Sequence, residues 1–596
     1  MTSFRIEQLT LDAAALTAWA ESDAKHRNWP IVYTLNGEDA IYIGESVNAV
    51  GRLRQHLESP LKRELSSVRV VVDDHFNKSA CLDLESHLIR LVAGDGKFQL
   101  INRNVGITDA NYYRRGQYRQ AFSEVFEQLR ALGVLSRPVK EIEASDLFKL
   151  SPFKALTPDQ AIAVEDILDG LFTDIAMGVR SRMLIEGEPG TGKTVVAIYL
   201  TKVLSDVRSG EMLDEPDEDM VLSKFFTRGY SDMLDEFRIG LVVPQQSLRE
   251  SIRGVFTKTP GLDRLMVLSP FDVGLSEHHF DLLIVDEAHR LNQRANQSSG
   301  VNNKRFADIN LKLFGEDDKS RTQIDWINAM SDSQIFLVDE AQSVRPADVS
   351  KETLASLAQT IPEWRRYPLT SQMRVRAGDD YVGYVRRVIS TDPPAPRSFD
   401  GYEIWMFDNL GDMLEALRDR DREHGLGRAL AGYAWPWKSK KDKRAFDIEL
   451  DGQRLRWNST ERDWVNSPRA ADEVGSIHTI QGYDLNYAGV IIGNDLRYDP
   501  QAGRIYFDRD SYFDTKGKEN NASRGITYTD ADLLKFVENI YAVLMTRGMR
   551  GTFVYACDPP LRDYLRRFLP HDLGRRAAAS TAHPTDTVRA CPTLTD

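Results

Sequence analysis

A glycine-rich loop at residues 187–194 carries the residue types that bind nucleotide phosphates. It reads Gly-Glu-Pro-Gly-Thr-Gly-Lys-Thr, after an apolar segment at 182–186 and before a helical one. Its glycines let backbone N–H groups turn toward phosphate oxygens, while Lys193 reaches the β and γ oxygens and the Thr194 hydroxyl ligates Mg²⁺. We therefore expect a site for ATP and Mg²⁺ that contains Gly187, Gly190, Thr191, Gly192, Lys193 and Thr194.

Two later apolar segments end in nearly the same acidic sequence. Residues 280–285 run into Asp-Glu-Ala-His, and residues 334–338 run into Asp-Glu-Ala-Gln. Continuous apolar runs are typical of central strands in a parallel sheet that is covered on both faces. We expect Asp286 to hold Mg²⁺ through water, Glu287 to polarise the attacking water and Gln342 to sense the γ-phosphate. Exchange of roles between the two acidic pairs remains an alternative.

The N-terminal region begins with an expected hairpin and helix that carry polar side chains. Residues 30–44 read as two strands joined by an Asn-Gly-Glu-Asp turn. Ser46 or Asn48 is expected to cap the helix that follows. Arg52 and His56 are four residues apart on that helix, so both side chains project from one face.

Glu85 stands where a carboxylate is unfavourable. It lies inside the apolar stripe of an expected helix over about 82–92, and such a position requires a cation or a metal. In residue types, order and spacing, the stretch 30–115 resembles the GIY-YIG nuclease family. The first signature is degenerate, reading Ile-Val-Tyr, and the second is intact. The residues that carry the resemblance are Tyr33, Tyr42-Ile43-Gly44, Arg52, His56, Glu85 and Asn102.

This resemblance implies a metal-dependent endonuclease. Glu85 would hold Mg²⁺ or Mn²⁺ largely through water, and Arg52 would grip the scissile phosphate. Tyr42, helped by Tyr33 and His56, would activate the attacking water, although the sequence leaves open which tyrosine is the base. Asn102 would hold the fold or the metal shell. A decayed nuclease that is kept as a DNA-docking platform is the alternative.

Residues 155–570 resemble superfamily 1 helicases. Gln160, which lies ahead of the glycine-rich loop, resembles the residue that reads the adenine edge. Residues 242–248 resemble a motif that touches the nucleic-acid backbone, and residues 371–374, 478–484 and 541–547 resemble the fourth, fifth and sixth motifs. The resemblance implies that Arg374 and Arg547 are arginine fingers reaching the γ-phosphate.

Composition sets broad limits on the protein. The 596 residues carry a net charge of −13, and residues 1–120 hold as many basic as acidic side chains, so the acidic excess lies in 121–596. No apolar run is long enough to span a bilayer, no signal peptide is visible, and three cysteines are too few for a disulfide framework, so we expect a cytoplasmic protein. The basic run 438–444, beside Tyr433, Trp435 and Trp437, suits single-stranded nucleic acid or is a solvated loop.

The expected architecture is α/β, with a small nuclease domain followed by two RecA-like P-loop lobes that have parallel sheets. The expected function is an ATP-driven helicase or translocase coupled to an endonuclease that cuts DNA, single-stranded or forked, with RNA not excluded. With this function we expect a role in defence against foreign DNA or in repair. We also expect a protein partner or a homo-oligomer. The rivals are a helicase with a dead docking domain and an ATP-gated switch that remodels proteins. The expected divisions are 1–120 nuclease, 121–154 linker, 155–348 and 349–573 lobes, and 574–596 disordered tail.

Overall fold

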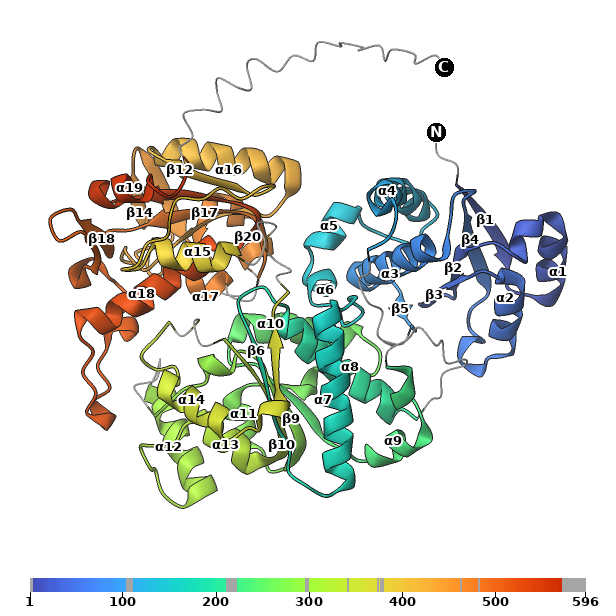
Figure 1. Cartoon of the computed structure of the whole chain (residues 1–596), viewed down its shortest axis with the longest axis horizontal. Coiled ribbons are helices and arrows are strands. Elements are labelled where there is room, and N and C mark those ends of the chain that lie inside the picture. The colour runs from blue at the N-terminus through green and yellow to red at the C-terminus, as the bar shows by residue number, and fades with distance from the viewer. Residues whose placement is uncertain are drawn as a thin grey trace, which may run out of the picture.

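Three large β-sheets follow one another along the chain in the computed structural model (Figure 1). The N-terminal sheet, blue in Figure 1, lies to one side of two larger α/β units, which are stacked on each other. The structure describes residues 4–102, 111–210, 222–294, 300–339, 342, 344–371, 375, 380–460, 464–480 and 483–570. Arg374 and the expected tail 574–596 lie outside the described residues.

The N-terminal sheet has the strand order β1-β4-β2-β3-β5. The expected hairpin is confirmed, because β2 and β3 pair antiparallel with Tyr33 opposite Gly44. The helix that follows the hairpin is capped by Asn48, whose side-chain oxygen accepts a hydrogen bond from the Gly51 N–H at 3.0 Å. The elements are β1 (Arg5–Thr10), α1 (Ala13–Ser22), β2 (Ile31–Asn36), β3 (Ala40–Ser46), α2 (Ala49–Glu58), β4 (Ser67–Val72), α3 (Lys78–Asp95) and β5 (Gln99–Leu100).

Three helices connect this sheet to the rest of the molecule. They are α4 (Arg115–Ala131), α5 (Val139–Ala144) and α6 (Asp146–Lys149). The first begins before residue 120 and shares one apolar core with α3. A methyl group at Gly94 of α3 would lie 2.7 Å from the Cβ atom of Phe148, so α3 and α6 approach closely there. The Lys149 ammonium donates to the Asp484 carbonyl at 3.1 Å, which ties this connector to the C-terminal unit.

The central sheet is parallel throughout, in the order β11-β6-β10-β9-β7-β8. Helices cover both faces: Ile335 and Leu337 of β10 pack in one apolar core, and Phe336 and Val338 pack in the other. The sheet includes β11, which pairs with β6 beyond the expected boundary at residue 348. The strands are β6 (Arg182–Gly187), β7 (Ile239–Val242), β8 (Val267–Leu268), β9 (Phe280–Val285), β10 (Ser331–Val338) and β11 (Arg366–Leu369). The helices are α7 (Pro158–Ala176), α8 (Lys193–Arg208), α9 (Arg228–Met233), α10 (Gln246–Lys258), α11 (Pro270–Leu275), α12 (Gly300–Phe314), α13 (Gln323–Met330) and α14 (Lys351–Gln359).

The C-terminal sheet has the order β12-β20-β17-β13-β16-β15-β14. Its strands are parallel except for the antiparallel hairpin β14–β15 at one edge. The strands are β12 (Glu403–Phe407), β13 (Gly427–Ala431), β14 (Ile448–Leu450), β15 (Gln453–Trp457), β16 (Glu473–Gly475), β17 (Leu485–Ile492) and β20 (Gly548–Ala556), and β18 (Leu496–Asp499) with β19 (Arg504–Phe507) forms a separate pair. The helices are α15 (Asp380–Val388), α16 (Leu410–His424), α17 (Ile477–Ile480), α18 (Asp530–Met545) and α19 (Pro559–Leu565).

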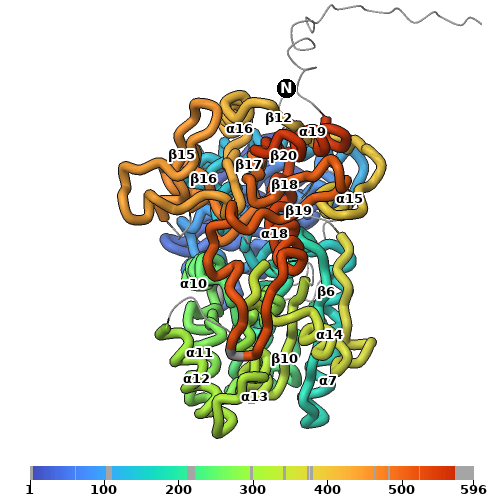
Figure 2. The backbone as a smooth tube through the Cα atoms, turned by 90° about the vertical axis from the view of Figure 1, so that its left-hand side faces the viewer, coloured from blue at the N-terminus to red at the C-terminus, as the bar shows by residue number. Residues whose placement is uncertain are grey.

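A long connection between β19 and α18 reaches from the C-terminal unit down to the central one (Figure 2). On it, the Asn521 amide donates to the Arg294 carbonyl at 3.3 Å, and the Tyr528 hydroxyl donates to the Pro346 carbonyl at 3.2 Å. The two units are therefore joined by contacts along this connection as well as at their facing strand ends. Of the helices in the described ranges, none combines the length and apolar character that a membrane crossing needs.

Candidate functional site

The glycine-rich loop lies between β6 and α8, at the carboxyl end of the central sheet. Gly190 and Gly192 have φ values of 93° and 81°, a left-handed conformation that glycine adopts without strain. A methyl group at Gly187 would lie 2.5 Å from the Thr191 hydroxyl, so the loop closes tightly on itself. The Lys193 ammonium donates to the Gly187 carbonyl at 2.6 Å, at the N-terminus of α8, where the helix dipole favours anions.

Thr194, at the start of α8, meets the first acidic pair, which follows β9. The Thr194 hydroxyl donates to Asp286 Oδ2 at 2.8 Å, and the Glu287 carboxylate lies 2.9 Å from His289 Nε2. Burial raises the pKa of Asp286, and the adjacent Glu287 charge adds to this. Burial alone would raise the pKa of Glu287 as well, but His289 and Lys193 outweigh it and lower that pKa. Glu287 has a φ of 49°, an unfavourable conformation that the turn after β9 holds in place.

The second acidic pair contributes to the same region. Lys193 Nζ lies 3.5 Å from Asp339, whose carboxylate accepts a hydrogen bond from the Gln342 amide at 2.6 Å. The other end of that amide, Gln342 Oε1, lies 3.4 Å from Arg547 Nη2. Arg547 belongs to the C-terminal unit, at the turn from α18 to β20, and it is fully buried. One chain of contacts therefore leads from the loop lysine to an arginine of the other unit.

Gln160 lies next to the loop, and its side-chain amide forms hydrogen bonds within the protein. Its side-chain nitrogen donates to the Thr191 carbonyl at 2.7 Å, and its side-chain oxygen accepts from the Thr157 N–H at 3.1 Å. The second contact is part of the capping box that begins α7. The fully buried Gln160 amide therefore fixes the loop to α7 in this structure, and its adenine-reading role stays a prediction.

The motif at 242–248 contacts the motif at 478–484 across the two units. Gln245 Nε2 donates to the His478 carbonyl at 3.0 Å. Just beyond the first motif, the Ser251 hydroxyl on α10 lies 2.7 Å from that of Tyr483. The His478 imidazole hydrogen-bonds with Arg345. Burial and then this arginine's charge hold the pKa of His478 well below its ordinary value. His478 is therefore neutral at physiological pH and keeps its contacts without a buried charge.

A second polar site lies between the N-terminal sheet and α2. The Tyr33 hydroxyl lies 2.7 Å from His56 Nε2, and the Lys62 ammonium lies 2.8 Å from His56 Nδ1. An ammonium has only donors, so Nδ1 accepts from Lys62, and in the neutral ring Nε2 carries the proton and donates it to the Tyr33 oxygen. Lys62 also lies 4.0 Å from the centre of the Tyr42 ring.

The electrostatics of this site centre on Tyr33 and His56. Burial raises the pKa of Tyr33 well above its ordinary value, with Tyr42 and Glu85 adding to the rise and Arg52 opposing it. Burial, followed by the charges of Lys62 and Arg52, lowers the pKa of His56 to about 3. The expected residues therefore influence one another as a group, and His56 is neutral over the physiological range.

Gly44 and Asn102 have geometric tasks at this site. A methyl group at Gly44 would lie 2.5 Å from the Tyr33 hydroxyl, so the Tyr33 side chain crosses the backbone at a place where only hydrogen fits. Asn102 donates to the Ile43 carbonyl at 2.7 Å and accepts from the Ile43 N–H at 3.0 Å. The Asn102 amide thus continues the pairing of β5 with β3, which supports fold-holding as its role.

Sequence reasoning gave no role to two residues of these sites, Lys62 and His289. Lys62 lies in a short turn after α2, where a single lysine gives no motif signal. The contact of His289 with Glu287 becomes visible only in the folded structure. Asp339 entered the sequence analysis only through the alternative that exchanges the two acidic pairs, and its contact with Lys193 likewise requires the folded structure. Within the described residues, no group of three or more His, Cys, Asp and Glu side chains is arranged to hold a metal.

Comparison with known proteins links residues 180–558 to a family model described as the Schlafen group 3, DNA/RNA helicase domain. The chain is also 28% identical over 417 residues to the uncharacterized protein YPL245W of Saccharomyces cerevisiae, covering 64% of this chain and 83% of the yeast protein. Two solved structures each cover 70% of this chain and 97% of their own. One concerns DNA unwinding at forked dsDNA by two coordinating Pif1 helicases, at 9% identity and a TM-score of 0.24. The other is a Bacteroides Pif1 helicase in complex with ADP-AlF3 and ssDNA, at 10% identity and a TM-score of 0.23. At such low TM-scores the superpositions do not establish a shared fold.

Proposed function

This chain belongs to the Schlafen group 3 DNA/RNA helicase domain family, and from this premise we propose that it is an ATP-dependent nucleic-acid motor coupled to a metal-dependent endonuclease. The observation that carries the motor is the chain of contacts from Lys193 through Asp339 and Gln342 to Arg547 of the other unit. We propose that the central and C-terminal units are RecA-like lobes near the expected divisions 155–348 and 349–573, with β11 assigned to the first lobe.

The residues at the loop fit a nucleotide and Mg²⁺. The positive φ values of Gly190 and Gly192 support a loop whose N–H groups face phosphates, and Lys193 supplies the cation. The hydroxyl of Thr194 and the carboxylate of Asp286, 2.8 Å apart, are hard oxygen donors of the kind that Mg²⁺ prefers. This pairing favours the first acidic pair as the metal-holding one. Bound Mg²⁺ would neutralise charge on the phosphates.

Around that site, the protein's own groups have separable tasks. Glu287, kept ionised by His289, is the group that would orient and deprotonate water. Gln342 and Arg547 report the state of the site to the C-terminal lobe, because their contact spans the two lobes. Closing and opening of this contact would move the lobes relative to each other along a bound strand. Arg374 is proposed as a second finger from its sequence position alone.

We propose that residues 1–120 form the nuclease and 121–154 connect it to the motor. The contact of Tyr33 with His56, and the influence of Arg52, Tyr42 and Glu85 on Tyr33, support a common site. Tyr42 is the better candidate for the base, since it is half-buried whereas Tyr33 is wholly buried with a raised pKa. Glu85, the carboxylate of this group, would hold Mg²⁺ or Mn²⁺ largely through water, and the ion would stabilise the leaving oxygen. A role in cytoplasmic defence against foreign DNA, or in repair, rests on the pairing of cutter and motor.

The test is cleavage of labelled single-stranded, duplex, forked and nicked DNA, with RNA counterparts, in Mg²⁺ or Mn²⁺ and with or without ATP. The wild type is compared with Glu85→Ala and Lys193→Ala. Cleavage that is lost in the first variant, and that responds to ATP only when Lys193 is intact, supports a motor-coupled nuclease. Absence of cleavage with nucleic-acid-stimulated ATPase supports the docking alternative. ATPase that is indifferent to nucleic acid supports the protein-remodelling switch.

A further inference from the structure

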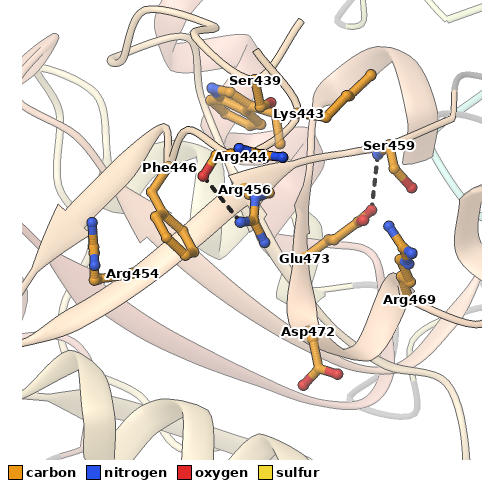
Figure 3. A pocket seen from close by; sticks show the side chains of 11 residues that line it. Ser439, Lys443, Arg444, Phe446, Arg454, Arg456, Ser459, Arg469, Asp472 and Glu473 are labelled. Atoms are coloured by element: carbon orange, nitrogen blue, oxygen red, sulfur yellow. Dashed lines mark hydrogen bonds between the residues drawn. The ribbon is translucent and has the colours of Figure 1, made fainter.

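A basic pocket of about 700 Å³ lies at the edge of the C-terminal sheet, apart from both sites described above (Figure 3). It is built on the antiparallel hairpin β14–β15, the segment before it and the segment that leads into β16. The charged side chains that line it are Lys443, Arg444, Arg454, Arg456, Arg469, Asp472 and Glu473. Five of these seven are cations in a chain whose net charge is −13.

The arginines of the hairpin are held in place. The guanidinium carbons of Arg454 and Arg456 lie 4.4 and 4.1 Å from the centre of the Phe446 ring, which stands between them in Figure 3. Arg456 also donates to the carbonyls of Ala445 at 3.1 Å and Arg444 at 3.2 Å. A guanidinium that is already oriented loses less conformational entropy when it binds an anion.

The acidic residues do not neutralise the pocket. Glu473 is buried and accepts hydrogen bonds from the Ser459 N–H at 2.9 Å and the Trp464 indole at 3.0 Å. Arg454 pairs with Glu449 at 3.4 Å, but both side chains are exposed, so water screens that pair. Lys443, Arg444 and Arg469 are exposed and make no ion pair with any residue in the described ranges. Three cations without an ion-pair partner in the described ranges therefore face solvent at the pocket. Asp472 is exposed there as well, and the lining as a whole keeps a positive charge.

The pocket is linked along the chain to the contact between the two lobes. Glu473, on the pocket wall, begins β16, which ends at Gly475 just before α17. That helix carries His478, whose carbonyl accepts the hydrogen bond from Gln245 of the central lobe. The pocket wall and the contact between the two lobes are therefore connected through β16 and α17.

We propose that this pocket binds the phosphodiester backbone of a single-stranded nucleic acid, an inference that rests on the motor function proposed above. Guanidinium forks match phosphate oxygens, and the exposed cations are spread along two segments, 443–456 and 469, as a polymer requires. The guanidinium groups of Arg454 and Arg456 both pack against the Phe446 ring, so this ring is not open for stacking with a base. The pocket therefore presents cations. Recognition is therefore of phosphates and independent of base sequence.

The test measures binding of a labelled oligo(dT) and oligo(rU) to the full chain by fluorescence anisotropy between about 50 and 200 mM salt. The variant Lys443→Gln/Arg444→Gln/Arg469→Gln removes the three uncompensated charges. The matched control Arg387→Gln/Arg422→Gln/Arg566→Gln removes three exposed arginines, on α15, on α16 and directly after α19. We expect the slope of log Kd against log salt to fall by about 2 in the pocket variant, because each single-strand phosphate contact contributes about 0.7. The Kd should rise roughly tenfold or more at physiological salt, with the control unchanged.

Each other outcome overturns a defined part of the argument. An unchanged slope in the pocket variant, with oligonucleotide-stimulated ATPase in the wild type, overturns the pocket and leaves the motor standing. A wild type that binds neither oligonucleotide overturns both proposals. A poly-glutamate peptide that binds the wild type and not the pocket variant, while oligonucleotide binding is equal in the two, assigns the pocket to an acidic protein segment and overturns the proposal.

Discussion

The Arg547 guanidinium of the C-terminal lobe lies 3.4 Å from the side-chain oxygen of Gln342 in the central lobe, across a separation of 205 residues. Gln342 in turn donates to Asp339, which lies 3.5 Å from the loop lysine Lys193. Asp339 and Gln342 therefore connect the loop lysine to the C-terminal unit through polar contacts. A change in the contacts of Lys193 can therefore reach the C-terminal unit through Asp339 and Gln342.

Replacement of Arg547 by alanine should lower kcat for ATP hydrolysis by roughly 10³-fold, since an arginine finger stabilises charge on the γ-phosphate. Arg547→Lys should recover little, because a lysine lacks the planar fork. Phosphate release and oligonucleotide anisotropy are measured together, and binding of the oligonucleotide should persist. Arg566→Ala, at an exposed arginine directly after α19, is the matched control. Full ATPase activity in Arg547→Ala would show that Arg547 is not an arginine finger.

Glu287→Gln should lower the rate of ATP hydrolysis by about 10²-fold or more, because the amide cannot accept the proton of the attacking water. Nucleotide binding should remain. Lys193→Ala should weaken the binding of a fluorescent ATP analogue as well. The same two measurements on Glu340→Gln decide between the acidic pairs. A larger loss of hydrolysis in Glu340→Gln than in Glu287→Gln would assign the catalytic role to the second acidic pair. That outcome would contradict the assignment drawn from the hydrogen bond between Thr194 and Asp286.

Glu85→Ala should eliminate DNA cleavage and leave ATPase activity within about twofold of the wild type, since Glu85 lies on α3 of the N-terminal unit and the glycine-rich loop belongs to the central unit. Glu143→Ala, another glutamate of the N-terminal helices, is the control. Cleavage products are resolved on a sequencing gel over a range of Mg²⁺ and Mn²⁺ concentrations. Equal cleavage by the wild type and Glu85→Ala would show that the activity does not arise at this site.

Lys62→Met should raise the pKa of His56 from about 3 toward its ordinary value, because removal of a neighbouring positive charge favours the imidazolium form. Burial, the larger cause of the lowered pKa, remains, so the rise is partial. Lys62→Arg keeps the charge and serves as the control. Histidine ring NMR signals are followed from about pH 3 to pH 8. A His56 titration identical in both variants would mean that Lys62 does not tune the ring.

Asp495 gives the protein a stability that falls as pH rises. Burial raises the pKa of this carboxyl from 3.8 to about 7, although the Tyr541 hydroxyl donates to it at 2.6 Å. A pKa that is raised in the folded state contributes stability at low pH, and this contribution is lost as pH climbs through about 7. Asp495→Asn keeps an acceptor for Tyr541 and avoids the charge. The difference in Tm between Asp495→Asn and the wild type should increase by several degrees, in favour of the variant, between about pH 5 and pH 8. A difference that stays constant over this range would contradict the raised pKa of Asp495.

Short-range physical rules predicted the elements that meet around the glycine-rich loop. The glycines of the loop, the apolar runs of β9 and β10 and the acidic residues at their ends are local features. Parallel strands place their carboxyl ends on one edge, so Lys193, Asp286 and Gln342 come together once the sheet forms. The hairpin of the N-terminal sheet and the capping of α2 by Asn48 are equally local.

The tertiary structure decided the remainder, because it depends on which elements pack together. The placement of Lys62 against His56, the use of the Gln160 amide by the Thr191 carbonyl and the pairing of β11 with β6 have no periodic or spacing signal. The basic run at 438–444 was visible as a charge pattern, but its pocket forms only when the hairpin brings Arg454 and Arg456 around Phe446. Sequence by itself thus determined the local conformations and chemical groups of this protein, and long-range packing determined which of those groups meet.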